Sequence, residues 1–126
     1  MKSRLLSLLA ALLVAASGSV VASEYKVLVV MSYEEDNPWV KEIREGIDDV
    51  LKPSADITYF HMNTKADRQG GPRKAEEAFA LFQSLQPNGV ITADDDAQAM
   101  FVLPYLKNTT TPVMFNGVNE IGRAHV

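Results

Sequence analysis

The chain has 126 residues, of which 47% are hydrophobic and 22% are charged, and its formal net charge is −4 at pH 7. This acidic excess gives no electrostatic basis for binding nucleic acid or an anionic membrane surface. The absence of cysteine excludes disulfides, thiolate nucleophiles and thiolate metal sites.

The amino-terminal segment has the three-part pattern of a secretory signal peptide. Lys2 and Arg4 precede an apolar stretch over residues 5–16, and small residues then follow with a Val20-x-Ala22 cleavage pattern. The apolar stretch is shorter than the ~20 residues that a membrane-spanning helix needs. We therefore expect residues 1–22 to be removed on export, which leaves a periplasmic protein that does not insert directly in the membrane. An uncleaved amino-terminal anchor is the alternative.

The first half of the remaining chain predicts a strand, a helix and a second strand. Residues 25–32 are a β-branched apolar run without strict alternation, which is typical of a strand covered on both faces. Asn37 and Pro38 form a helix start, and apolar residues then recur at helical spacing until Pro53 ends the helix. Residues 56–62 predict the second strand.

The second half continues the alternation of helices and strands. Residues 72–85 predict a helix with an apolar stripe, and residues 90–93 predict a short strand. A further helix is expected over residues 97–107, with a kink or an early end at Pro104. Residues 112–116 predict the fourth strand.

This order of elements predicts an α/β fold. Each connection between strands is long enough for a helix, so the strands should be parallel and the crossovers right-handed. We expect residues 23–119 to form one doubly wound, three-layer, Rossmann-like domain with strand order 2-1-3-4.

Residues 120–126 do not continue this pattern. They resemble one reading frame of a common sequencing adapter, and they follow a turn-like segment at a point where an α/β domain would be in mid-course. We expect a non-native tail on the amino-terminal fragment of a longer protein. An ordinary frayed terminus is the alternative.

Polar loops follow the first, third and fourth predicted strands, at the edge where open α/β sheets bind ligands. Helix N-termini in this edge direct unpaired N–H groups toward the crevice. The candidates after the first strand are the hydroxyl of Ser32 and the aromatic rings of Tyr33 and Trp39. Each also has a structural interpretation, as a strand end, a loop contact or a helix contact with the sheet.

The acidic triplet Asp94, Asp95 and Asp96 follows the third strand. Together with the acidic residues 34–36 it could hold Mg²⁺ or Ca²⁺, as in phosphoryl-accepting receiver domains. One of these aspartates should instead cap the next helix, in a solvated loop. The functional interpretation that we favour is a carboxylate that binds the ammonium group of a ligand.

The sequence offers little for catalysis. His61 is the only histidine outside residues 120–126, and no Ser/His/Asp set can be assembled. We therefore expect a protein that is not an enzyme, with no catalytic residues, no metal and no cofactor.

Seven segments spread over residues 25–119 carry a resemblance to a known family. They are, in chain order, Val27-Leu-Val-Val-Met-Ser-Tyr33, Asn37-Pro-Trp39, Ile43-Arg-Glu-Gly-Ile47, Asn63-Thr-Lys65, Gly89-Val-Ile-Thr-Ala-Asp-Asp95, Val102-Leu-Pro-Tyr-Leu-Lys107 and Pro112-Val-Met-Phe-Asn-Gly-Val-Asn119. Together they resemble the exported substrate-binding proteins of ABC transporters, a family similar to the type 1 periplasmic binding proteins. Similar sequences also occur as periplasmic sensing domains of signalling receptors.

The resemblance implies a lobe that binds a small polar solute. In such proteins a hinge closes two α/β lobes on a ligand, and this chain would be most of the first lobe. The implied partners are that solute, such as an amino acid, and an ABC permease in the membrane. One lobe alone is expected to bind the solute weakly or not at all. The implied ligand-binding positions are Ser32, Tyr33, Trp39, Asp94, Asp95, Asn116 and Gly117. A receptor's ligand-sensing domain is the alternative function, and an enzyme with an acidic metal site is the third.

Overall fold

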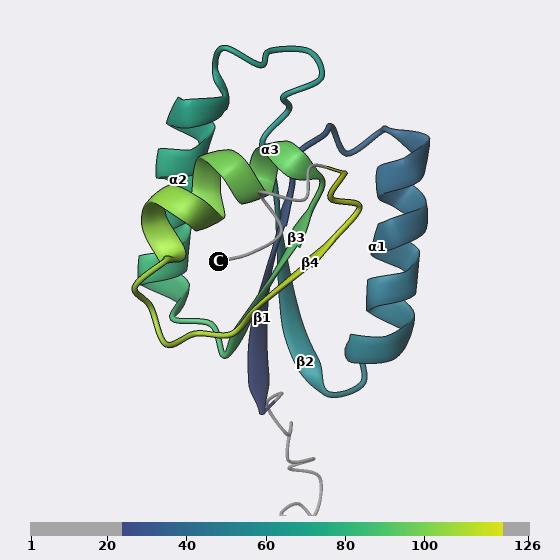
Figure 1. Cartoon of the computed structure of the whole chain (residues 1–126). Helices are drawn as coiled ribbons and strands as arrows, with labels where there is room; N and C mark the ends of the chain where they lie inside the picture. The colour runs from purple at the N-terminus through teal and green to yellow at the C-terminus, as the bar shows by residue number, and fades with distance from the viewer. Residues whose placement is uncertain (1–23, 120–126) are drawn as a thin grey trace, which may run out of the picture.

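The computed structural model describes residues 24–119, which alternate strands and helices along the whole of that range (Figure 1). The predictions for the signal peptide, residues 1–22, and for the tail, residues 120–126, lie outside the described residues. The elements in chain order are β1 (Tyr25–Met31), α1 (Pro38–Leu51), β2 (Ala55–His61), α2 (Gly71–Leu85), β3 (Gly89–Ala93), α3 (Asp95–Ala97), η1 (Gln98–Leu106) and β4 (Val113–Asn116).

The strands form one four-stranded sheet with the order β2-β1-β3-β4, and every pairing in it is parallel. In the interior of the sheet, Val29 of β1 lies between Tyr59 of β2 and Ile91 of β3. The predicted α/β class, the parallel sheet and the strand order are therefore confirmed.

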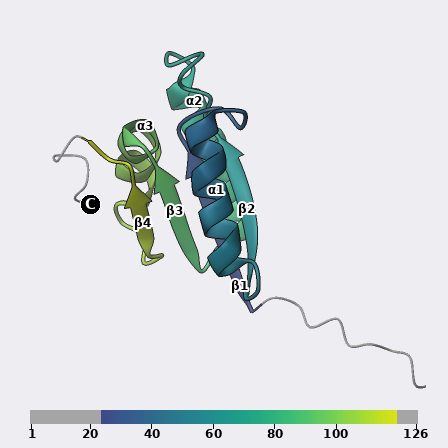
Figure 2. The ribbon, with the colours of Figure 1, turned by 90° about the vertical axis from the view of Figure 1, so that its right-hand side faces the viewer.

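The helices cover the two faces of the sheet unequally. Helix α1 packs on one face, while α2 and the α3–η1 segment pack on the other (Figure 1). Viewed from the α1 side, that helix lies in front of β1 and β2, and no helix of residues 24–119 lies in front of β3 and β4 (Figure 2). The sheet is the middle of three layers, and one outer layer is narrower than the other.

Strand β1 is buried on both sides, as its continuous apolar run predicts. Leu28 and Val30 belong to the core cluster under α2 and η1, whereas Val29 and Met31 belong to the cluster under α1. All four are 0% exposed. Alternate side chains of a strand point to opposite faces, so one short strand contributes to both cores.

The start of α1 follows directly from its sequence. The side-chain oxygen of Asn37 accepts hydrogen bonds from the N–H groups of Trp39, at 3.0 Å, and Val40, at 3.4 Å. Pro38 occupies the first helical position, where its missing N–H leaves no hydrogen bond unmade. This cap fixes the first turn of α1 and with it the direction of the Trp39 side chain. Trp39 therefore lies at the edge of the sheet where the strands end.

The segment before β4 differs from its prediction. Instead of one α-helix that kinks or ends at Pro104, the chain forms the single turn α3 and then a π-helix, η1, that continues through Pro104 to Leu106. In an α-helix the proline ring would collide with the carbonyl four residues earlier, and the wider π turn relieves this contact. Phe101 and Val102 of η1 are 0% exposed. Among residues 24–119, no helix combines the length and the apolar character that crossing a membrane requires.

Candidate functional site

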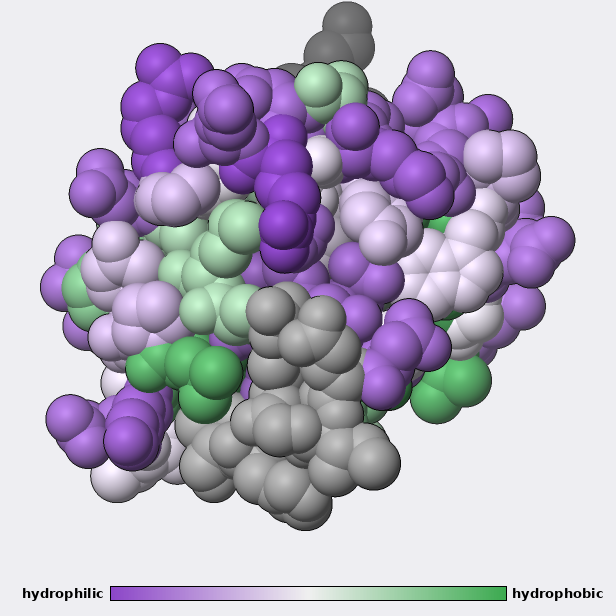
Figure 3. Space-filling view, turned by 45° about the horizontal axis from the view of Figure 1, so that its top comes forward, coloured by the Kyte–Doolittle hydropathy of each residue, from purple (hydrophilic) through white to green (hydrophobic). Residues whose placement is uncertain are grey.

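All four strands end at the same edge of the sheet, and the loops that follow them meet there. Figure 3 brings this end of the molecule forward and shows that hydrophilic residues predominate on it, with paler and weakly apolar areas between them (Figure 3). The side chains at this edge fall into a buried hydrogen-bond junction, an aromatic pair and a group of carboxylates.

Ser32 forms the buried junction between three segments. It is 1% exposed, and its hydroxyl donates to the carbonyl of Ala93 at 2.7 Å and accepts from the N–H of Ala97 at 2.8 Å. Its carbonyl accepts from both the N–H and the hydroxyl of Thr64, each at 2.9 Å. Ser32 therefore positions the loops after β1, β2 and β3, and a direct contact of its hydroxyl with a ligand stays a prediction.

Tyr33 and Trp39 form an aromatic pair at the end of β1. Their ring centroids are 6.0 Å apart and the ring planes are tilted by 56°. Trp39 is 37% exposed, and the ammonium nitrogen of Lys65 lies 4.5 Å from the centre of the Tyr33 ring. The Tyr33 face thus already holds a cation, which is the interaction that an aromatic ring offers to an ammonium group.

The phenol of Tyr33 also faces the acidic triplet. Partial burial, a hydrogen bond to the Asp94 side chain and the negative charges of the three aspartates raise the pKa of Tyr33 from 10.0 to about 12. Each cause disfavours the phenolate, so this hydroxyl stays a hydrogen-bond donor throughout the physiological range.

Asp94 has the most unusual backbone at this edge. Its φ of 74° and ψ of 166° lie in a region that is essentially restricted to glycine. Its side chain accepts a hydrogen bond of 3.5 Å from the N–H of Asp96, and its own N–H donates to the carbonyl of Asn116 at 3.0 Å. The predicted cap of the following helix is thus Asp94.

The other two aspartates also have partners within the protein. Asp95 accepts a hydrogen bond of 3.0 Å from the N–H of Asn119. Asp96, which is 8% exposed, pairs with the guanidinium of Arg68 at 3.2 Å. Across the part of the chain that the structure describes, no group of three or more His, Asp or Glu side chains is arranged to hold a metal ion.

Asn116 and Gly117 lie at this edge, where β4 ends. Gly117 has a φ of +65°, and a Cβ at this position would lie 2.7 Å from an edge carbon of the Trp39 indole. The side-chain oxygen of Asn116 is buried and has no hydrogen-bond partner within residues 24–119. Glycine is therefore required at position 117, both by the positive φ of the backbone and by the close approach of the Trp39 indole.

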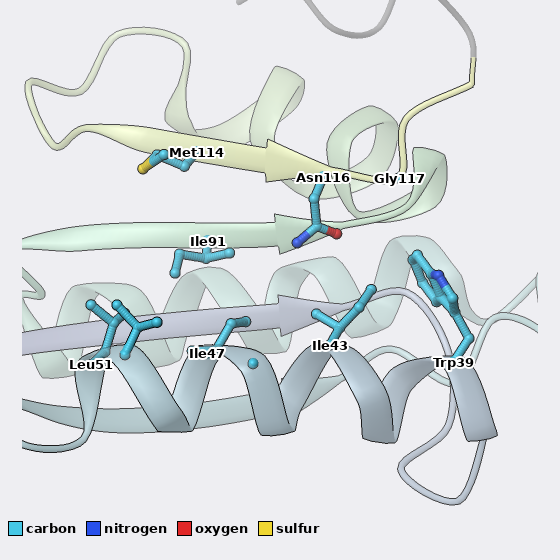
Figure 4. A pocket seen from close by; sticks show the side chains of 10 residues that line it. Trp39, Ile43, Ile47, Leu51, Ile91, Met114, Asn116 and Gly117 are labelled. Carbon is cyan, nitrogen blue, oxygen red and sulfur yellow. The ribbon is translucent and has the colours of Figure 1, made fainter.

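A groove begins at this point and runs down the α1 face of the sheet. It has a volume of about 590 Å³ and is lined by Trp39, Asn116 and Gly117 at one end and by apolar residues of α1, β3 and β4 along its length. Figure 4 shows the side chains of α1 and of the strands pointing into it from opposite sides (Figure 4).

The structure brings the predicted residues together at one edge. Tyr33 contacts both Trp39 and Asp94, the backbones of Asp94 and Asn116 are hydrogen-bonded, and Trp39 lies against Gly117. Whether they bind a ligand stays a prediction.

The sequence interpretation missed Lys65 and Arg68, which lie in the loop after β2 and contact Tyr33 and Asp96 respectively. Because all four predicted strands are parallel, the second strand also ends at the edge where open α/β sheets place their ligands, and this was the signal that could have pointed to the loop.

Comparison with known proteins finds no matching family model, no similar curated protein and no similar solved structure. A function for this edge must therefore be argued from its own chemistry.

Proposed function

We propose that this protein is an exported solute-binding protein that captures a small polar molecule, such as an amino acid, and delivers it to an ABC permease in the membrane. Residues 1–22 would direct export to the periplasm, and residues 23–119 would form the amino-terminal lobe. The support comes from the family resemblance in the sequence and from the chemistry of the strand-end edge.

The observation that carries the proposal is the juxtaposition of an aromatic pair with groups of both charges. Tyr33 and Trp39 present rings beside the carboxylate of Asp94, and the ammonium group of Lys65 lies over the Tyr33 ring. An amino acid carries an ammonium and a carboxylate on one carbon atom. Asp94 and Asp95 are suited to the first of these groups, and Lys65 is suited to the second.

The same edge explains how a ligand would be oriented. The half-exposed indole of Trp39 offers a flat apolar surface. The amide of Asn116 has a buried oxygen that lacks a protein partner within residues 24–119, and it could accept a hydrogen bond from a ligand that enters beside Trp39. A single lobe supplies only one side of a binding site, so we expect millimolar affinity from this chain alone, because tight sites bury about 70–90% of the ligand surface.

Trp39 provides a direct test, since it is the only tryptophan in the chain. Titration with a panel of amino acids should shift its single indole N–H signal in an NMR spectrum in a saturable way. Asp95→Asn should weaken the response at least several-fold, because it removes a carboxylate charge from the edge. Tyr25→Ala, which changes an exposed aromatic residue at the opposite end of β1, is the matched control and should leave the response unchanged.

A response to no polar solute at all, or one equally sensitive to Tyr25→Ala, would count against the proposed site. A ligand-sensing receptor domain would give the same binding results. The two functions differ in what depends on the protein: a membrane permease depends on a transport protein, and a signalling module depends on a sensing domain.

An enzyme with an acidic metal site is the competing class. Calorimetric titration with Mg²⁺ and with Ca²⁺ tests it, and saturable heat that disappears in Asp95→Ala would favour the metal site. We expect no such heat, because within residues 24–119 no group of three or more His, Asp or Glu side chains is arranged to hold a metal ion.

A further inference from the structure

Lys65 lies in the loop after β2, and the residues on both sides of it are anchored to the loop after β1. Its predecessor Thr64 is 3% exposed, and the N–H and the hydroxyl of Thr64 both donate to the carbonyl of Ser32 at 2.9 Å. Its successor Ala66 donates its N–H to a carboxylate oxygen of Glu34 at 2.7 Å. The backbone position of Lys65 at the strand-end edge is therefore fixed.

The face of the Tyr33 ring is occupied by a cation from the protein itself. The ammonium nitrogen of Lys65 lies 4.5 Å from the ring centre, and among residues 24–119 this ammonium forms no ion pair with a carboxylate. An aromatic face attracts a cation, but a second cation beside the first is repelled by it. A ligand that carries only positive charge therefore finds this position already taken.

A carboxylate lies at the hydroxyl end of the same ring. Asp94 is 7% exposed, its side chain is hydrogen-bonded to the Tyr33 phenol, and it has no cationic partner in the part of the chain that the structure describes. Its neighbour Asp96 differs, because Arg68 pairs with it at 3.2 Å. A largely buried carboxylate without a cation has lost hydration and gained no opposite charge. Asp94 therefore favours a ligand that brings a positive charge.

These two charged groups do not neutralise each other. Lys65 and Asp94 form no ion pair, although the Tyr33 side chain contacts both. An amine would satisfy Asp94 but would add a positive charge beside Lys65, and a simple carboxylic acid would add a negative charge beside Asp94. Only a ligand with an ammonium and a carboxylate complements both groups.

We propose that Lys65 is the residue that restricts this site to zwitterionic ligands, and that it selects amino acids against the amines that lack their carboxylate. This inference rests on the proposed solute site and narrows its substrate class. Lys65 binds the carboxylate of the right ligand through a charge-assisted hydrogen bond and repels a ligand without one, so attraction and repulsion act in the same direction. Because Lys65 is exposed, its charge is partly screened, and we expect a preference of severalfold.

The test compares three amino acids with their decarboxylated amines: leucine with isoamylamine, phenylalanine with phenethylamine, and lysine with cadaverine. The whole chain is titrated and the indole N–H signal of Trp39 is followed by NMR. Each amino acid that binds should bind at least fivefold more tightly than its amine. Lys65→Met removes the charge but keeps an apolar stem, so the amino acid should weaken, the amine should gain, and the preference should fall below twofold.

Two further variants serve as controls. Lys107→Met removes an exposed lysine that follows η1 on the way to the start of β4, away from the ends of the strands, and it should leave the preference unchanged. Lys65→Arg should also retain the preference, because a guanidinium both stacks on an aromatic ring and pairs with a carboxylate.

The outcomes separate this inference from the proposed function. If no amino acid and no amine shifts the Trp39 signal in the intact chain or in any variant, the solute site itself is wrong. If amino acids bind but show no preference over amines, or keep their preference in Lys65→Met, only the role of Lys65 is overturned. The same holds if Lys65→Met binds amino acids more tightly, because Lys65 would then only compete with the ligand's ammonium for the Tyr33 ring.

Discussion

Asp94 joins three segments of the chain at the end of β3, although its own backbone is strained. A residue other than glycine in this φ/ψ region costs about 1–3 kcal/mol. The carboxylate offsets this cost by capping the N–H of Asp96 and by accepting a hydrogen bond from Tyr33, while the backbone N–H binds the carbonyl of Asn116. Strain that is maintained by surrounding contacts often marks a functional edge, which is consistent with the position of Asp94 beside the aromatic pair.

The titration of Tyr33 measures this arrangement directly. Its pKa should lie near 12 rather than at 10.0 in the folded protein, and Asp94→Asn should lower it, because the hydrogen bond to a carboxylate and its charge both oppose the phenolate. The measurement is the ultraviolet absorbance of tyrosinate as a function of pH, with Tyr33→Phe subtracted. That subtraction is necessary because burial and a hydrogen bond to Asp48 also raise the pKa of Tyr59.

The sign of the stability effect follows from the same shift. Folding favours the protonated phenol, so its contribution to the free energy of unfolding is complete below pH 10 and is lost as the pH rises through about 12. Tyr33→Phe should flatten the pH dependence of unfolding over that window. Asp48→Asn should leave the Tyr33 titration where it was, and a Tyr33 pKa of 10 in the intact protein would contradict the contact with Asp94.

At the scale of elements, α1 depends on its first turn for its orientation on the sheet. Asn37→Ala removes the side-chain oxygen that accepts from the N–H groups of Trp39 and Val40. The free energy of unfolding should fall by about 1 kcal/mol. Urea denaturation measures the change, and Asn108→Ala, at an exposed position, is the control that should have no measurable effect. A loss equal to that of the control would mean that Pro38 alone fixes the helix start.

Local sequence patterns predicted most elements because each is specified by its own residues. Four apolar runs and the helical stripes between them determine the crossovers, and right-handed crossovers then limit the possible strand orders. The π-helix could not be predicted in this way. Pro104 indicates a disturbed helix, but the widening of the turn depends on how Phe101 and Val102 pack in the core.

The candidate site was predictable in position but not in its contacts. Parallel strands place their carboxyl ends at one edge, so Tyr33, Asp94 and Asn116 could be grouped from the strand order alone. That Arg68 neutralises Asp96 and that Lys65 lies over Tyr33 could not be read from their spacing. These contacts depend on the path of the loop after β2, which tertiary packing determines.

For the whole molecule, the sheet separates two cores of different composition. Phe101 and Leu28 lie in the cluster under α2 and η1, whereas the cluster under α1 is built around smaller side chains such as Val29 and Val40. Because one helix covers the α1 face and the groove leaves part of it exposed, most of the large buried side chains lie on the other side. The stability of the fold should therefore depend mainly on the α2–η1 side.

This asymmetry predicts very different losses from two truncations on opposite sides of the sheet. Phe101→Ala should lower the free energy of unfolding by about 3–5 kcal/mol, because it leaves a cavity in place of a fully buried ring. Met114→Ala should change it by less than about 0.5 kcal/mol, since that side chain is 70% exposed in the groove. Urea denaturation measures both. Because small domains have a total stability of about 5–15 kcal/mol, the first variant should be close to unfolding at ordinary temperatures. A large loss in Met114→Ala would instead show that the groove is already covered in solution, and it would place a second source of stability on the α1 face.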